Sequence, residues 1–222
     1  MPEAQAVDLP DNVSDDVGAS LGIPGITSYT AVMADGPVAG KVVLVNGVLG
    51  AVSRLAAQLA FAGGATVIGT VRNAVDALEV VDDIFAHVVA LDAPDPSAMI
   101  LEDAPAGVDR IIEVAFSANV DLDARVVAQG AVIASYASPE ERPRLPYWPL
   151  AFANVTIRLL GSDDFPAEAK REAAQRLTEA GAAGQISIPI AGPYALEDIA
   201  AAHEAVERGG RDGRVLLSLT DG

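Results

Sequence analysis

The chain has 222 residues, of which 51% are hydrophobic and 20% are charged, so it carries enough apolar residues for a folded core and is not a disordered chain. Its 31 acidic and 14 basic residues give a formal charge of -17, so we expect neither nucleic acid nor a membrane as a partner. It contains no cysteine, and its N-terminal residues lack the basic and apolar segments of a secretion signal. We therefore expect a cytoplasmic protein without disulfides or thiolate zinc sites.

The N-terminal segment, residues 1–29, has no strand pattern of its own. It contains a Pro-Asp turn at residues 10–11 and a short helix for which Ser14 is the expected N-cap. Such a segment cannot bury a core alone, so we expect it to be part of a larger unit.

The central region, residues 30–165, alternates short β-branched runs with longer alanine-rich stretches. This alternation is typical of βαβ units, and it predicts an α/β fold with a doubly wound, six-stranded parallel sheet of the Rossmann type. The expected strands are 41–47, 65–71, 87–92, 108–115, 130–137 and 154–161.

Two crossover helices are expected between the first three strands. The first covers residues 53–64, where Leu55 and Leu59 lie on one apolar face and two glycines end the helix. The second covers residues 73–85, with Asn73 as its N-cap. Its apolar face would consist of Ala74, Leu78 and Val81.

The C-terminal region, residues 166–222, has a different pattern. Pro166 occupies the first turn of an expected helix, which Gly181 ends. A strand, a helix and a strand are expected to follow at 186–194, 195–210 and 213–219. Two strands and one helix make a poor core, so this end of the chain also looks like part of something larger.

The first strand-to-helix turn carries the sequence NGVLGAVSR. In a Rossmann fold this turn brings the N-terminal amides of a helix against a pyrophosphate, and glycine lets the backbone approach closely. Gly47 and Gly50 fit this role, whereas Ala51 and Ser53 stand where further glycines are frequent. The alternative is a tight βα turn without a nucleotide. The expected cofactor-binding residues of the turn are Gly47, Gly50, Ala51 and Val52.

Arg72 lies 22 residues after Gly50, close to the position where dinucleotide-binding folds recognise the ribose. An acidic residue there selects NAD, whereas an arginine accommodates the 2′-phosphate of NADP. Together with the glycine turn, Arg72 favours NADPH as the cofactor, and the adjacent Asn73 is also expected to bind it. The alternative is a solvated arginine at the end of a strand.

Six segments carry motifs that occur together in one family. They are GASLGIPGITSY (18–29), KVVLVNGVLGAV (41–52), GTVRN (69–73), GVDRIIEVAF (107–116), PLAFANVTIRLL (149–160) and EDIAAAHEAVERG (197–209). With these segments the chain resembles the zinc-independent medium-chain dehydrogenase/reductases, and among them the NADPH:quinone oxidoreductases. The resemblance implies hydride transfer from NADPH to a quinone, an enone or a similar conjugated carbonyl. A repurposed, non-redox protein, such as a cyclase, an isomerase or a cofactor-binding scaffold, is the open alternative.

The resemblance also implies cofactor-binding residues. It places Thr27 beside the nicotinamide, the stretch from Val114 to Phe116 along the nicotinamide pocket, and Tyr136 over the cofactor. It assigns no catalytic side chain and no metal ligand. In this family the sixth strand pairs with its symmetry mate, so a homodimer through residues 154–161 is implied.

Most of the family's N-terminal GroES-like barrel has no counterpart in this sequence. Residues 1–29 and 166–222 resemble its flanking helix and its C-terminal return, so we expect catalytic-domain remnants at both ends and weak turnover. The loop at 138–150 either closes one side of the pocket, with Tyr147 and Trp148 as an aromatic wall, or uses these aromatics to pack the loop or an interface.

Other chemistries find little support. His87 opens a strand, and His203 shares a helical face with apolar residues, which indicates a position at the edge of a core rather than a base. No tyrosine is followed four residues later by a lysine, which disfavours a short-chain reductase. Asp163 and Asp164 precede Pro166, so we expect them to cap the next helix rather than to bind a metal.

Overall fold

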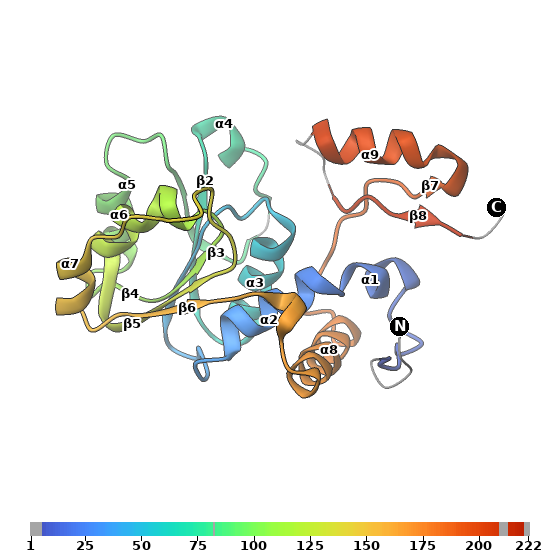
Figure 1. Ribbon diagram of the computed structural model, residues 1–222, viewed down its shortest axis with the longest axis horizontal. Coiled ribbons are helices and arrows are strands. Elements are labelled where there is room, and N and C mark those ends of the chain that lie inside the picture. Colours follow the sequence, from blue (N-terminus) through green and yellow to red (C-terminus); the bar gives the residue numbers. More distant parts are fainter. Residues whose placement is uncertain (1–5, 82, 209–212, 220–222) are drawn as a thin grey trace.

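The structure is a computed structural model that describes residues 6–81, 83–208 and 213–219. Its described part contains a six-stranded sheet in the order β3-β2-β1-β4-β5-β6, with every pair parallel (Figure 1). This order reverses between β1 and β4, which confirms the expected doubly wound α/β fold of the Rossmann type. The strands are β1 Val42–Val45, β2 Thr66–Val71, β3 Phe85–Ala90, β4 Val108–Glu113, β5 Val127–Ser135 and β6 Thr156–Leu159.

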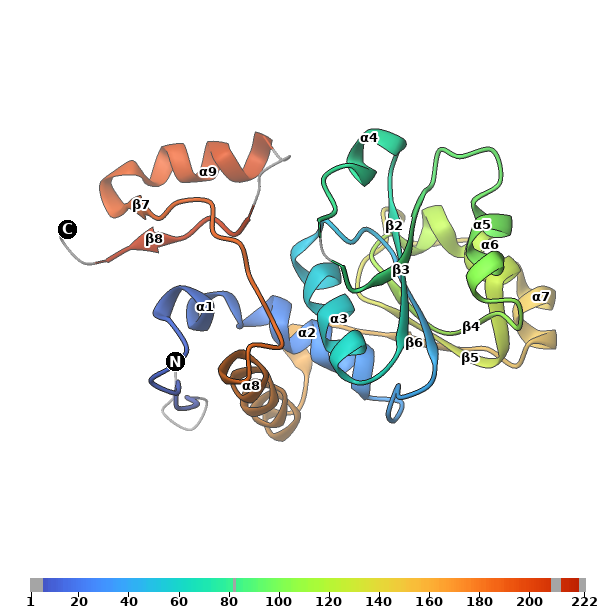
Figure 2. The same cartoon turned by 180° about the vertical axis from the view of Figure 1, so that it is seen from behind.

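Besides the one-turn helix α4 (Ala74–Ala77), five helices accompany the strands in the described part of the chain. They are α2 Ile23–Met33, α3 Ala51–Ala62, α5 Pro96–Asp103, α6 Phe116–Val126 and α7 Tyr147–Phe152. In β1, Val43 and Val45 pack with α2 and α3, whereas Leu44 packs with α5, α6 and α7 on the other face (Figure 2). Both faces of the sheet are therefore covered, as a parallel sheet requires. No described helix is long and apolar enough to cross a membrane.

The segments before and after the sheet domain pack together on α2 and α3. These segments contribute the helices α1 (Asp15–Ser20) and α8 (Ala167–Ala182). One hydrophobic cluster contains residues of α1, α2, α3 and α8. Gly25 permits the close approach, because a Cβ at this position would lie 2.9 Å from Leu177 Cδ1. Helix α2 runs without a break across residue 29, so the N-terminal segment and the sheet domain share one helix.

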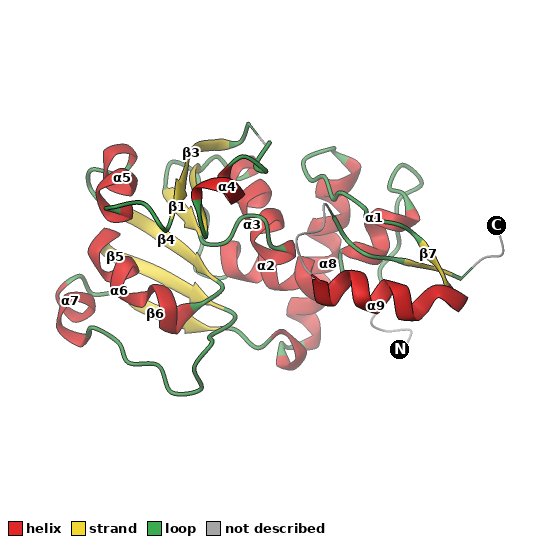
Figure 3. Ribbon diagram, turned by 90° about the horizontal axis from the view of Figure 1, so that it is seen from above, coloured by secondary structure: helices red, strands yellow, loops and turns green. Residues whose placement is uncertain are grey.

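The last described residues form a small unit at the end of the molecule that also holds α1 and α8 (Figure 3). Its elements are β7 Tyr194–Ala195, the 3-10 turn η3 Leu196–Asp198, α9 Ile199–Arg208 and β8 Leu217–Ser218. The strands are much shorter than the expected 186–194 and 213–219. In α9, Ala202 is buried but His203 is exposed, so its expected place at the edge of a core is wrong.

The connection between β2 and β3 also differs from the expectation. The sequence predicts a helix over 73–85, but α4 covers only Ala74–Ala77. Leu78 and Val81, which the pattern assigns to an apolar packing face, are 82% and 80% exposed. A helix of a single turn has no continuous face to pack, so these side chains remain on the surface.

Asp163 and Asp164 do not cap α8, in contrast to the expectation. They belong to the 3-10 turn η2 (Ser162–Asp164), and the N-cap position of α8 is Pro166, which has no side-chain cap hydrogen bond. The carbonyl oxygen of Asp163 instead accepts a hydrogen bond from Lys170 Nζ at 2.6 Å. The 3-10 turn thus separates both carboxylates from the first turn of the helix.

A buried arginine ties the sheet to the end of α2. Arg110 in β4 is 1% exposed, and its guanidinium donates to the carbonyl oxygens of Val32, Asp35 and Gly36. The last carbonyl groups of a helix have no partner within the helix, so a buried donor that reaches them removes a desolvation cost. The carboxylate of Asp35 in turn accepts two hydrogen bonds from Arg158 in β6, at 2.5 and 2.6 Å, and these lower the pKa of Asp35.

We predict that Arg110→Met destabilises the fold. Methionine retains an apolar stem but leaves the three carbonyl oxygens without their donor, so the free energy of unfolding should fall by about 3 kcal/mol. Urea unfolding followed by circular dichroism measures this change. The matched control is Arg142→Met at an exposed loop position, which should stay within about 0.5 kcal/mol of the parent. Equal stabilities for the two variants would contradict the anchoring role of Arg110.

Candidate functional site

A large cavity of about 1060 Å³ lies at the carboxyl ends of four strands. Gly47, Arg72, Leu91 and Val114, which follow β1, β2, β3 and β4, all line it. Ligands of doubly wound sheets bind at this edge, next to the point where the strand order reverses. The C-terminal segment contributes a further wall through Ser187, Ile188, Pro189, Gly213 and Arg214.

The turn after β1 favours glycine at two positions. Gly47 has a φ of +68°, where other residues are strained, and a Cβ there would lie 3.0 Å from Val114 Cγ1. Gly50 is the N-cap of α3, and a Cβ there would lie 3.1 Å from the Gly47 carbonyl oxygen. The first N–H groups of α3 have no partner within the helix, and Ala51 places this first turn at the cavity. The turn is therefore suited to an anion.

Ser53 occupies the helix-packing position of the turn and is fully buried. Its hydroxyl donates to the carbonyl oxygen of Asn46 at 2.6 Å and lies 2.8 Å from the hydroxyl of Tyr136. Because Ser53 uses its proton for Asn46, Tyr136 is the donor to Ser53. The hydrogen bond from Ser53 thus joins α3 to the end of β1, on either side of the glycine turn.

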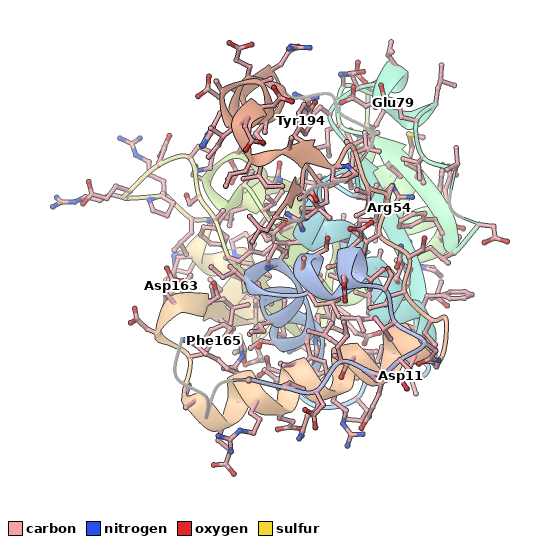
Figure 4. The ribbon with its side chains drawn as sticks, turned by 90° about the vertical axis from the view of Figure 1, so that its right-hand side faces the viewer. Asp11, Arg54, Glu79, Asp163, Phe165 and Tyr194 are labelled. Atoms are coloured by element: carbon pink, nitrogen blue, oxygen red, sulfur yellow. The ribbon has the colours of Figure 1, made fainter. Side chains whose placement is uncertain are left out.

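A smaller cavity of about 340 Å³ brings together Thr27, Val52 and Tyr136. The hydroxyl of Thr27 donates to the carbonyl oxygen of Ile23 at 2.7 Å, within α2. Burial raises the pKa of Tyr136 to about 12, so its hydroxyl keeps its proton near neutral pH. Asp163, labelled in Figure 4, also lines this cavity.

The rim of the large cavity carries Arg72, whose side chain is 84% exposed. Its Nε donates to Asp76 Oδ2 at 3.1 Å. Asn73 next to it caps α4, accepting hydrogen bonds from the N–H groups of Val75 and Asp76 at 3.0 Å. Arg72 is therefore solvated and also lies at the cavity. The two interpretations of Arg72, as a residue that recognises a 2′-phosphate and as a solvated arginine at a strand end, do not exclude each other.

The structure divides the residues expected at the cofactor between these cavities. Arg72 and Val114 line the large one with Gly47, Gly50 and Ala51. Asn73 and Phe116 line neither, and Phe116 is 4% exposed within the hydrophobic core. The smaller cavity holds Thr27, Val52 and Tyr136.

The aromatic residues of α7 lie away from both cavities. Tyr147 and Trp148 are 64% and 65% exposed, and their ring centroids are 5.2 Å apart. Phe152 stacks on Trp148 at 5.6 Å. These rings therefore pack on one another at the surface and do not form a wall of either cavity.

Two buried carboxyl groups lie directly behind the glycine turn. The side-chain amide of Asn46 donates to both of them, to Glu113 Oε2 and to Asp123 Oδ1. Glu113 also accepts from the backbone N–H of Ala115 and from Asn119 Nδ2 at 3.0 Å. Burial raises the pKa of both carboxyl groups, most strongly that of Asp123.

The sequence patterns do not point to this pair of carboxyl groups. The available signal was the presence of polar residues inside otherwise apolar runs, Asn46 at the end of one strand and Glu113 at the end of another. Asp123 lies on α6 and carries no comparable signal, because acidic residues are common on the exposed faces of helices. Among the described residues, no group of three or more His, Cys, Asp or Glu side chains is placed to hold a metal ion.

A family model for zinc-binding dehydrogenases matches residues 75–217, more than half of the chain. The chain belongs to this family. The quinone oxidoreductases of Pongo abelii and Mus musculus are 29% and 31% identical to it, in each case over 95% of this chain. The chain spans 65% of the length of these two relatives.

Solved structures share the fold at lower identity. A mycobacterial quinone oxidoreductase superposes with a TM-score of 0.86 at 24% identity, covering 95% of this chain and 67% of its own. A mycobacterial protein complexed with NADPH superposes with a TM-score of 0.83 at 24% identity, covering 98% of this chain and 70% of its own. The expected resemblance to medium-chain dehydrogenase/reductases of the quinone oxidoreductase type is confirmed.

We predict that Asp123→Asn changes how stability depends on pH. Folding raises the pKa of both carboxyl groups above the ordinary values of 3.8 for Asp123 and 4.5 for Glu113. The contribution of the pair to the stability of the fold is therefore complete below these ordinary values and is lost as the pH rises through the raised values. Asparagine cannot ionise, so the free energy of unfolding of Asp123→Asn should increase relative to that of the parent as the pH rises, by about 1.4 kcal/mol for each unit by which folding raises the pKa.

Unfolding free energies measured from pH 4 to pH 8 check this prediction. Asp121→Asn is the matched control, because Asp121 lies two residues away on α6 and is exposed. Curves that run parallel for the parent and Asp123→Asn would show that the pair does not titrate in this range.

Proposed function

We propose that this chain binds NADPH and forms the cofactor-binding part of an oxidoreductase that transfers a hydride to a quinone, an enone or a similar conjugated carbonyl. The observation that carries the proposal is the large cavity at the switch point of the sheet, with the turn from Gly47 to Gly50 at one end and Arg72 on its rim. The quinone oxidoreductases among the relatives, and the NADPH in the complex of a structural neighbour, support it.

The two cavities correspond to the two ends of a dinucleotide. The adenosine end, with its 2′-phosphate, would occupy the large cavity near Arg72, and the pyrophosphate would meet the first turn of α3. The nicotinamide, which supplies the hydride when bound, would reach the smaller cavity beside Thr27 and Tyr136. Since Tyr136 keeps its proton and donates to Ser53, it adds no negative charge near the ring.

Hydride transfer is tested by mixing the chain with NADPH and simple quinones or enones and following the absorbance of the nicotinamide. Oxidation of NADPH that depends on the acceptor would support the proposal. NADPH binding without oxidation would favour the non-redox alternative, and the absence of NADPH binding would overturn the proposal.

We predict that Arg72→Ala removes a preference for NADPH over NADH. The guanidinium at the end of β2 can pair with a 2′-phosphate, which NADH lacks, so the Kd for NADPH should rise about tenfold while that for NADH stays within about twofold. Fluorescence titration of the reduced nicotinamide measures both constants. Arg142→Ala, at an exposed loop position, is the control. Equal affinities of the parent for NADPH and NADH would contradict the assignment.

We further propose that two copies associate through β6. This strand ends the sheet, and residues 145–161 around it contain no acidic residue and a single basic one, Arg158, in a chain of charge -17. Leu159 and Phe152 are 76% and 74% exposed in this region. Two copies can therefore approach here with little charge repulsion and can pair the open strand edges.

We predict that Leu159→Pro produces a monomer. The N–H of Leu160 donates to β5, and alternate residues of a strand face opposite edges, so the N–H of Leu159 faces the open edge. Proline removes this donor without removing a hydrogen bond to β5. Light scattering at micromolar concentration measures the mass. Leu159→Thr, which retains the N–H, should remain dimeric, and a monomeric parent would exclude the interface.

A further inference from the structure

One face of α3 carries Arg54 and, one helical turn later, Gln58. The side chain of Gln58 pairs with the backbone of Ser187: its Nε2 donates to the carbonyl oxygen at 3.0 Å, and its Oε1 accepts from the N–H at 2.7 Å. Gln58 is 5% exposed, so this pairing lies away from water. It fixes the C-terminal segment against α3.

Arg54 lines the large cavity together with Ser187 and Pro189 of that same segment. Its backbone N–H donates to the carbonyl oxygen of Gly50 at 2.8 Å, so the residue belongs to the first turn of α3. Figure 4 shows Arg54 on α3 and labels Glu79, which also lines this cavity. Arg54 therefore stands where the glycine turn, the helix and the C-terminal segment meet.

The charge of the cavity differs from that of the whole chain. Its described charged residues are three arginines and two acidic residues, against 14 basic and 31 acidic residues in the sequence. Arg72 and the acidic residues Asp76 and Glu79 all lie in the connection that follows β2. Arg54, by contrast, adjoins the anion-binding first turn of α3.

We propose that Arg54 binds the pyrophosphate of the dinucleotide, adding a positive side chain to the backbone amides of the glycine turn. The inference rests on the proposed function, because it deepens the recognition at the same cavity. A guanidinium offers planar paired donors that match two phosphate oxygens. The Gln58–Ser187 pairing positions the C-terminal segment that forms the neighbouring wall of the cavity. Arg54 binds the pyrophosphate, which NADPH, NADH and ADP have in common.

The experiment compares Arg54→Gln, Arg54→Lys and the parent by titration with NADPH, NADH and ADP. Arg54→Gln should raise the Kd for all three ligands by a similar factor, about 10- to 100-fold. Arg54→Lys keeps the charge but loses the paired donors, so its Kd values should lie between those of the parent and Arg54→Gln. Arg142→Gln is the control for loss of a positive charge, and thermal unfolding verifies that each variant is folded.

The outcomes separate this inference from the proposed function. If the parent binds NADPH and Arg54→Gln changes its Kd by less than twofold, the role of Arg54 is wrong while the cofactor assignment stands. If the parent binds ADP but not NADPH, the proposed function fails, and the ADP titration alone decides on Arg54. A loss for NADPH without a loss for NADH and ADP would assign Arg54 to the 2′-phosphate and overturn the inference. A parent that binds none of the three overturns both.

Discussion

The site depends on a buried polar network around Asn46, the residue that directly follows β1. Its side-chain oxygen accepts from Thr70 at 2.8 Å, its amide donates to Glu113 and Asp123, and its carbonyl oxygen accepts from Ser53. Asn46 is fully buried, so every one of these groups must find its partner within the protein. The network therefore fixes where β1 stops, and with it the path of the glycine turn.

The cavities follow from the position of this turn. Gly47 and Gly50 bring the backbone and α3 against the large cavity, while Val52, two residues on, lines the smaller one. The remaining walls come from distant parts of the chain, Thr27 in α2 and residues 187–189 in the C-terminal segment. The N-terminal and C-terminal segments are held to the sheet domain by their packing on α2 and α3, so they contribute to the site although they lie outside the sheet.

Charge is distributed unevenly over this acidic protein. Three arginines and two acidic residues line the large cavity, and residues 145–161 around β6 include no acidic residue. A buried carboxyl pair with raised pKa values lies behind the turn from Gly47 to Gly50. Raised pKa values favour the neutral form of a carboxyl group, and a neutral carboxyl group places less negative charge behind the proposed pyrophosphate position than a carboxylate would.

The sequence by itself determined the six parallel strands, the glycine turn and the position of Arg72, because these depend on local patterns of β-branched residues, glycines and strand ends. It could not predict the exposed connection after α4, where an apolar periodicity at Leu78 and Val81 has no packing partner. The tertiary structure alone decided that Phe116 is a core residue, and that Glu113 and Asp123 share a buried site with Asn46. It also placed Arg54 and Ser187 in one cavity. Such juxtapositions join residues far apart in the chain, and the packing of helices on the sheet, rather than local sequence, sets their distances.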